Sequence, residues 1–136
     1  MPSSLQQFNF SIRTSKREEF VEITDEIRGY LHKSNVRDGF CKVFVPHTTA
    51  GITINENADI DVERDLLKIL RDLVPKGNYL HSEGNSDAHM KSSIIGSDVD
   101  VFIQDGNLML GQWQGIFFCE FDGPRTRRIY LQIHES

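Results

Sequence analysis

The sequence predicts an α+β fold in which two main helices pack on an antiparallel or mixed, sandwich-like arrangement of strands. Three observations favour this class. The 136 residues suit one compact domain spanning residues 1–136. Several short segments alternate apolar and polar residues, which is typical of strands with one buried face. Two longer segments instead repeat their apolar residues at helical spacing, and no repeat or linker divides the chain.

The first half of the chain is predicted to hold both helices. Phe8, Phe10 and Ile12 alternate with polar neighbours and predict the first strand. Thr24 is expected to cap a helix that ends near Asn35, because two acidic residues follow it where the helix dipole favours negative charge. The other expected elements are strands at 19–23, 40–45 and 51–55 and a helix from Asn57 or Asp59 to Leu73.

Every element after Ser92 is expected to be a strand. Alternating apolar residues predict strands at 99–103 and 129–133, and Asp105-Gly106-Asn107 is typical of a hairpin turn. The strand at 116–121 contains an unbroken apolar run, which predicts burial on both of its faces.

Composition and missing motifs exclude several classes of protein. Twenty acidic residues against fifteen basic ones give a charge of -5, which argues against general nucleic-acid binding. No signal peptide and no apolar run near the ~20 residues of a membrane span are visible, so we expect a cytoplasmic protein without membrane contact. Cys41 and Cys119 each lie in an apolar run and are expected to be reduced core residues. Phosphate-loop, dinucleotide-binding and serine-elbow motifs are absent.

The segment from Tyr79 to Lys91 concentrates ionisable groups. It lacks the apolar periodicity of a helix or strand and contains glycine, so we expect a loop with a chemical role. Its ionisable side chains are those of His81, Glu83, Asp87, His89 and Lys91.

Three histidines are expected to converge on one metal ion: His47, which follows a predicted strand, together with His81 and His89. Neutral imidazole suits a divalent metal such as zinc or another late first-row metal, with zinc the expected one, and three protein ligands leave a position open for water or substrate. Asp87 lies two residues from His89 and is a candidate to orient the imidazole or transfer a proton; Glu83 is the second candidate, and turn formation is the alternative for both.

Other polar residues are candidates for binding a phosphorylated substrate. Hydroxyl and backbone N–H groups in turns can cradle an anion, and Lys91 would supply a cation beside them, although ordinary turns contain the same residue types. A solitary tryptophan is more often part of a core or subunit interface, and turn arginines are more often solvated. The candidates are Thr48, Thr49, Asn55, Glu56, Ser92, Ser93, Gln112, Trp113 and Arg125.

Several uncommon motifs occur in the order found in the YjbQ-like family, which is also described as a secondary thiamine-phosphate synthase family. They are the sequences at 47–51, 55–57, 83–89, 91–96 and 111–115. The chain resembles this family over nearly its whole length. The resemblance implies a compact α+β fold that assembles as a homotrimer, a histidine site able to hold a metal, and a weak thiamine-phosphate synthase activity.

Two kinds of function follow as hypotheses. The first is a small metal-binding enzyme that acts on a phosphorylated or heterocyclic metabolite, either as a thiamine-phosphate synthase-like transferase or as a metal-dependent hydrolase. The usual catalysts of the synthase reaction are (β/α)8 barrels of ~250 residues, for which this chain is too short. The alternative is a non-catalytic protein that uses the same residues to hold a metal or ligand.

Overall fold

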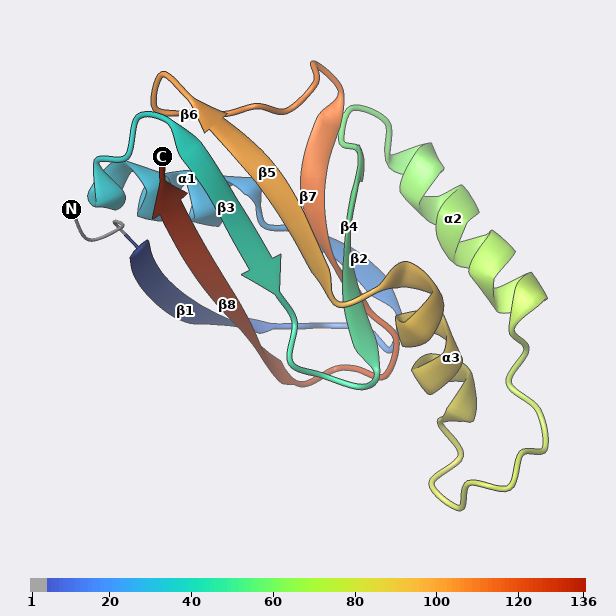
Figure 1. Ribbon diagram of the computed structural model, residues 1–136. Coiled ribbons are helices and arrows are strands. Elements are labelled where there is room, and N and C mark those ends of the chain that lie inside the picture. The colour runs from blue at the N-terminus through green and yellow to red at the C-terminus, as the bar shows by residue number, and fades with distance from the viewer. Residues whose placement is uncertain (1–4) are drawn as a thin grey trace.

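The computed structural model describes residues 5–136, which form eight strands and three helices arranged around two antiparallel sheets (Figure 1). The strands are β1 (Leu5–Arg13), β2 (Glu19–Glu22), β3 (Gly39–Phe44), β4 (Ala50–Glu56), β5 (Asp98–Gln104), β6 (Asn107–Leu108), β7 (Gln114–Glu120) and β8 (Thr126–Glu135). The helices are α1 (Thr24–Ser34), α2 (Ile60–Leu73) and α3 (Ser86–Ile95). The α+β class predicted from the sequence is confirmed.

The larger sheet has the strand order β1-β8-β3-β5-β6, and the smaller one has the order β2-β7-β4. The strands expected at 40–45 and 51–55 are therefore present but belong to different sheets, and the segment that contains His47 crosses between them. The predicted hairpin joins β5 to β6. Asp105 and Gly106 both have positive φ, at 52° and 77°, as a type I′ turn requires.

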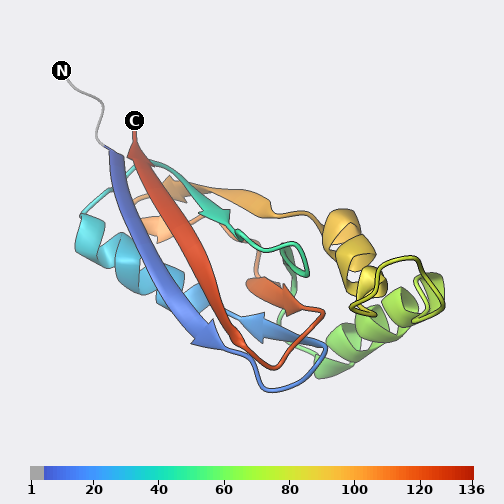
Figure 2. The ribbon, with the colours of Figure 1, turned by 90° about the horizontal axis from the view of Figure 1, so that it is seen from below.

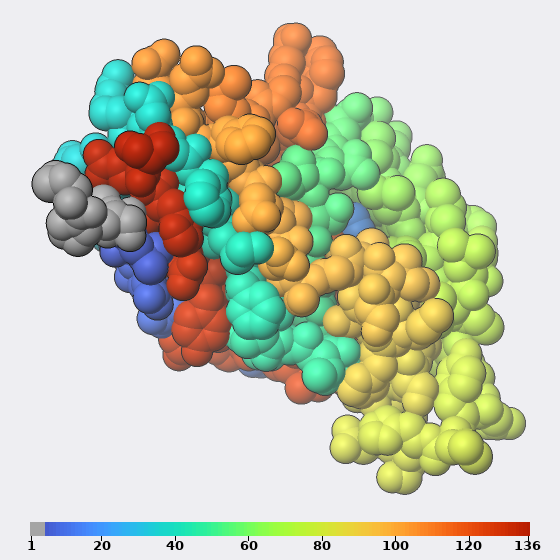
Figure 3. Space-filling model, in the orientation of Figure 1, coloured from blue at the N-terminus to red at the C-terminus, as the bar shows by residue number. Residues whose placement is uncertain are grey.

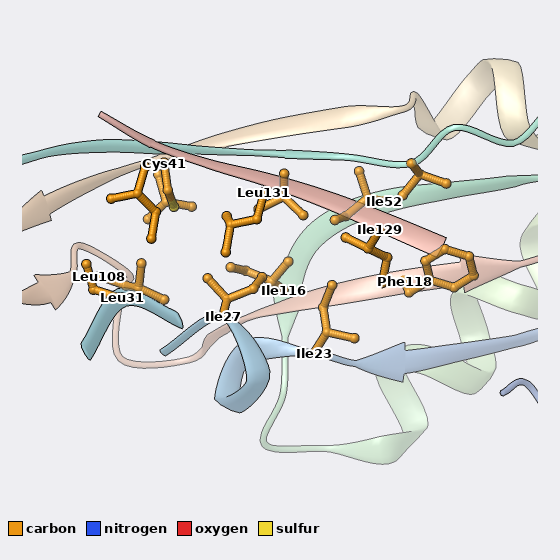
Figure 4. Close-up of a cluster of buried hydrophobic side chains, with 14 of the residues drawn as sticks. Ile23, Ile27, Leu31, Cys41, Ile52, Leu108, Ile116, Phe118, Ile129 and Leu131 are labelled. Atoms are coloured by element: carbon orange, nitrogen blue, oxygen red, sulfur yellow. The ribbon is translucent and has the colours of Figure 1, made fainter. Parts of the chain in front are cut away.

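Helix α1 covers the inner face of the larger sheet (Figure 2). Ile23, Ile27 and Leu31 recur at helical spacing and are almost completely buried. They pack against inward-facing residues of both sheets, such as Leu131 and Ile116 (Figure 4). This main core exists because each sheet presents alternate apolar residues to the other.

The prediction that Thr24 caps α1 is wrong by one residue. The helix includes Thr24, and the N-cap position is Ile23, which makes no side-chain capping bond. The Thr24 hydroxyl is buried and instead accepts a hydrogen bond from the Ile116 backbone N–H at 2.9 Å. The hydroxyl therefore ties α1 to β7 rather than satisfying the helix's own N–H groups.

Strand β7 is buried on both faces, as its apolar run predicted. Ile116 and Phe118 point into the main core, whereas Phe117 and Cys119 belong to a second apolar cluster. That cluster lies on the other side of the smaller sheet. Its remaining buried members come from β2, α2, α3 and the residue after β7, and they are Phe20, Leu70, Ala88 and Phe121.

Helix α2 matches the prediction closely. Asp59 caps it, because its side chain accepts a hydrogen bond from the Asp61 N–H at 2.9 Å. Leu70 is the buried residue on its apolar face. None of the helices within residues 5–136 is long and apolar enough to cross a membrane.

The predicted loop at 79–91 is wrong from Ser86 onward, and the expectation of strands alone after Ser92 is wrong as far as Ile95. These residues form α3, a third helix. Its buried residues are Asp87, Ala88, Lys91 and Ser92. They lie on one helical face, but that face is charged and small rather than apolar, so hydrophobic periodicity did not predict it.

Both cysteines are free and buried, which confirms their predicted role in the core. Burial raises the pKa of the Cys41 thiol to about 11. Burial also raises the pKa of Cys119 well above its ordinary value. Neither thiol is therefore a thiolate at neutral pH.

Candidate functional site

Two of the three predicted metal-binding histidines meet. His89 lies near the start of α3, and His81 lies in the loop before it. Their rings pack edge to face, with centroids 5.5 Å apart. Glu83 Oε2 lies 3.9 Å from His81 Nε2. Because His81 is exposed and His89 half-buried, this histidine pair has one side open to solvent.

His47 has a different partner. Its Nε2 accepts a hydrogen bond from the Arg128 backbone N–H at 2.9 Å. Strand β3 pairs with β8 only as far as Phe44 and Tyr130, so the imidazole occupies an N–H group that the departing strand leaves free. Burial lowers the pKa of His47, and the Arg127 charge lowers it further. The ring is therefore neutral at pH 7 with one nitrogen already engaged.

Within residues 5–136, no three or more His, Cys, Asp or Glu side chains are grouped as a metal centre requires. The histidine pair supplies two imidazoles of the three protein ligands that a catalytic zinc site takes. Convergence of all three histidines stays a prediction, and it would require His47 to exchange its Arg128 partner for the metal.

Asp87 and Lys91 belong to a buried network of ion pairs. Arg17 donates to both carboxylate oxygens of Asp87, at 3.3 and 3.2 Å. Lys91 Nζ lies 2.6 Å from Glu18 Oε2 and 3.4 Å from Asp87 Oδ2. Both Asp87 and Lys91 are 1% exposed. The network fastens α3 to the connection between β1 and β2.

The network also fixes the charge of Asp87. Burial acts to raise its pKa, but the hydrogen bonds and charge of Arg17, assisted by Lys91, outweigh burial and lower the pKa below its usual value. Asp87 is therefore ionised and has both oxygens occupied. This geometry favours a positioning role, in which Asp87 and Lys91 hold the helix that carries His89, over direct contact with a substrate.

The hydroxyl groups predicted to cradle an anion have two kinds of environment. Some are buried in hydrogen bonds that hold the fold together, and others are exposed. Thr49 Oγ1 accepts from Arg127 at 2.9 Å, and Ser92 Oγ donates to the Ala50 carbonyl at 2.6 Å; both residues are buried. Ser93 Oγ donates to the His89 carbonyl at 3.1 Å. Ser93 and Thr48 are exposed, so they are the members of the cradle accessible to a ligand.

The predicted substrate residues fall at two ends of β4. Asn55 and Glu56 end this strand, and β7 pairing places them beside Gly115 and Gln114, close to exposed Gln112 and Trp113. The His47 segment and Ser92 lie at the opposite end, beside Ala50. Six residues of strand separate the ends by roughly 20 Å at about 3.3 Å per residue. One small ligand cannot contact both groups within a single chain.

Arg125, just before β8, and Arg127, the second residue of β8, have different environments. Arg125 is exposed and donates to the Asp122 carboxylate at 3.0 Å. Arg127 is 2% exposed and pairs with the fully buried Glu120. The sequence made Arg125 a candidate for binding an anion, with a solvated turn charge as the alternative. The structural role of Arg127 was missed, although it shares the inward face of Ile129 and Leu131, and this alternation was the available signal. Arg17 and Glu18 gave no comparable signal.

The fold and these contacts define a small α+β protein in which a histidine pair lies at the start of a helix held by buried ion pairs. The chain belongs to the YjbQ-like UPF0047 protein family, whose model matches residues 8–136. The family resemblance seen in the sequence is therefore confirmed.

Relatives match over nearly their whole lengths. The chain is 54% identical to UPF0047 protein MJ1081 of Methanocaldococcus jannaschii, over 93% of this chain and 92% of the relative. It is 49% identical to UPF0047 protein YugU of Bacillus subtilis, over 90% and 94%. The crystal structure of an uncharacterised YjbQ/UPF0047 family protein from Clostridium acetobutylicum superimposes with a TM-score of 0.91 at 51% identity, covering 93% of this chain and 98% of that one.

Proposed function

We propose that the protein is a small zinc-dependent enzyme acting on a phosphorylated or heterocyclic metabolite, with the histidine pair as the core of its metal site. The contact between the His81 and His89 rings, on a surface open to solvent, carries this proposal. Two imidazoles favour zinc over magnesium, which prefers oxygen ligands. When bound, the ion would supply a Lewis acid for a phosphoryl or carbonyl oxygen.

The chain's own residues have distinct roles in this proposal. His81 and His89 hold the ion, and Glu83 is the exposed carboxylate placed to accept a proton near His81. Asp87 and Lys91 keep α3, and with it His89, in position. Exposed Thr48 and Ser93 are the hydroxyls left to contact the anionic part of a substrate. A weak thiamine-phosphate synthase reaction is one activity this arrangement would serve; metal-dependent hydrolysis of a phosphorylated compound is the other.

Metal binding is tested first. Zinc at 100 times its Kd stabilises a folded protein by about 2.7 kcal/mol. We expect zinc to raise the melting temperature of the parent protein and to have little effect on His81→Ala or His89→Ala. His32→Ala, on the exposed face of α1, is the matched control and should respond like the parent. Equal responses from all four proteins would eliminate the histidine pair as the metal site.

Catalysis is tested on the metal-loaded protein. Phosphorylated metabolites, and the pyrimidine diphosphate and thiazole phosphate pair joined by thiamine-phosphate synthases, are screened with and without chelator. Glu83→Gln should lower turnover by roughly 10²- to 10⁴-fold while metal content is kept, because a general base is lost. Metal binding without turnover of any compound would support the alternative of a non-catalytic metal-binding protein.

Assembly as a homotrimer is part of the same proposal and comes from the family resemblance. Light scattering of the parent protein measures it directly. A single-chain mass at micromolar concentration would contradict it.

A further inference from the structure

The loop between α2 and α3, residues 74–85, projects from the body of the molecule (Figure 3). Leu80 is 105% exposed, the largest exposure among the large apolar side chains within residues 5–136. The neighbouring Tyr79 hydroxyl donates to the Pro75 carbonyl, so the loop has internal support for presenting this leucine. Burying a leucine side chain stabilises a protein by about 1.5–3 kcal/mol, and Leu80 does not contribute this stabilisation within its own chain.

The outer face of the larger sheet contains a complementary apolar surface. Phe40 and Phe102 lie directly opposite each other on β3 and β5, and both point away from the core. With Met109 they line a groove of about 480 Å³. Phe102 is 75% exposed and Met109 is 53% exposed. We call these three residues and the space between them the aromatic groove.

The apolar face continues along the same sheet. Phe44 and Tyr130 form a second exposed cross-strand pair on β3 and β8. Together with Phe40 and Phe102 they expose about as much surface as two whole aromatic side chains, roughly 300–500 Å². A standard interface covers about 800 Å² on each partner, so this face is large enough to form its apolar centre.

The loop cannot reach the groove of its own chain. The groove lies at the end of the larger sheet near the C-terminus, whereas the loop lies beyond α2 and α3 at the opposite end in both ribbon views (Figures 1 and 2). A projecting apolar side chain and an apolar groove on distant parts of one molecule are the two halves of a head-to-tail contact. Such contacts between copies close into rings when the rotation allows.

We propose that Leu80 of one copy of this chain docks in the aromatic groove of a second copy. The occupant is a second copy because one chain supplies both surfaces, each of them apolar and each otherwise exposed. The family resemblance implies an assembly but does not say which surfaces meet, and this geometry assigns them.

The docking has a consequence for the histidine pair, and this step rests on the proposed function. Leu80 directly precedes His81, so docking brings His81 and His89 to the boundary between two copies. The single chain supplies two imidazoles and no completed group of three ligands within residues 5–136. Docking therefore places side chains of the second copy beside this pair, where they are available to the metal site.

Cross-linking tests the contact. The chain carrying both Leu80→Cys and Phe102→Cys is treated with a short bismaleimide and run on a denaturing gel. Head-to-tail docking predicts covalent products of two or more chains from the double variant and none from either single variant. The parent is the reagent control, since Cys41 and Cys119 are buried. Dimers from Phe102→Cys alone would show that the sheets meet face to face, and no cross-linked product from the double variant would also overturn the proposal.

A second measurement does not depend on how readily the introduced cysteines react. Leu80→Asp should reduce the mass seen by light scattering while leaving the circular dichroism unchanged. Ile60→Asp is the matched control, because Ile60 is 60% exposed at the far end of α2 and should keep the parent mass. An unchanged mass for Leu80→Asp would overturn the proposal. Neither measurement involves metal, so failure of the docking and failure of the metal site are distinguishable.

Discussion

At the scale of single residues, the same side-chain chemistry has different consequences in different places on this chain. Lys91 and Lys68 each pair with an aspartate four positions away on a helix. The side chains of the Lys91–Asp87 pair are 2% and 1% exposed, whereas those of the Lys68–Asp72 pair are 69% and 66% exposed. Sequence spacing is equal in the two cases, so only burial separates a structural contact from a surface one.

Replacing Lys91 should therefore reveal a stabilising network. Lys91→Met leaves Glu18 and Asp87 short of a buried cation, and loss of one partner of a buried pair typically costs about 3–5 kcal/mol. Lys68→Met should change stability little, because its pair is exposed. Urea unfolding of both variants measures the difference. Equal stabilities would mean that the network around Lys91 contributes nothing to the fold.

His47 should give the fold a pH dependence near neutrality. Its pKa is lowered in the folded protein, chiefly by burial, so the unfolded chain binds the proton more readily. The stability of the neutral form is thus fully present above about pH 6.5 and is lost as the pH falls towards the lower folded pKa. His47→Gln keeps an acceptor for the Arg128 N–H and does not titrate.

Melting temperatures between pH 7.5 and 5.5 check this prediction. The parent should lose more stability than His47→Gln over that range. His32→Gln, on the exposed face of α1, should keep the pH dependence of the parent. A parallel decline for His47→Gln would refute the assignment.

At the scale of elements, α3 is positioned by close backbone approach as well as by ion pairs. The Ile52 N–H donates to the Gly96 carbonyl at 3.0 Å, where the helix ends against β4. Gly51 lies beside this contact, and a Cβ there would meet the Gly96 oxygen at 2.7 Å. Glycine is thus needed at position 51 for the helix to reach the strand.

Gly51→Ala should therefore destabilise the protein by roughly 1–3 kcal/mol, as expected for overpacking of a tight contact. Gly29→Ala is the matched control, because Gly29 lies within α1 and a Cβ there meets nothing within 4 Å. That change should stabilise by about 0.5–1 kcal/mol through helix propensity. Thermal unfolding of both variants compares them. A neutral Gly51→Ala would show that α3 can move away from β4 at no cost.

At the scale of the whole molecule, a buried ion pair joins the two sheets. Glu120 ends β7 of the smaller sheet, and Arg127 lies near the start of β8 of the larger one. Thr14 donates to Glu120 Oε2 at 2.8 Å, and Thr49 accepts from Arg127. The two charged side chains and the two hydroxyls thus satisfy one another's hydrogen-bonding groups at the point where the chain passes from β7 of one sheet to β8 of the other.

Glu120→Gln should leave the Arg127 charge uncompensated and cost about 3–5 kcal/mol. The double variant Glu120→Leu, Arg127→Met removes both charges and should be less destabilised than Glu120→Gln, because a buried pair is often replaceable by apolar residues. Urea unfolding ranks the two proteins. If the double variant is less stable than Glu120→Gln, the pair stabilises the fold through attraction between its charges, and the cost of one unpaired charge is the smaller effect.

The sequence by itself determined most of the elements and the family. Alternation located the strands, and the apolar run of β7 correctly predicted burial on both faces, because each pattern records contact with apolar neighbours. The bounds of α2 were predicted closely, with a start at Asn57 or Asp59 and an end at Leu73, because its apolar residues recur at helical spacing. The meeting of His81 with His89 was anticipated, since both lie within one short segment.

Tertiary structure decided what depends on residues distant in the sequence. Helix α3 buries Asp87 and Lys91, and that burial is tolerated only because Arg17 and Glu18, about 70 positions away, supply opposite charges. His47 could not be assigned from its neighbours, because its partner is a β8 N–H that is free only where β3 departs. Local sequence patterns indicate which face of an element is apolar. Which charged residues pair, and where one strand separates from its neighbour, depend on the path of the whole chain.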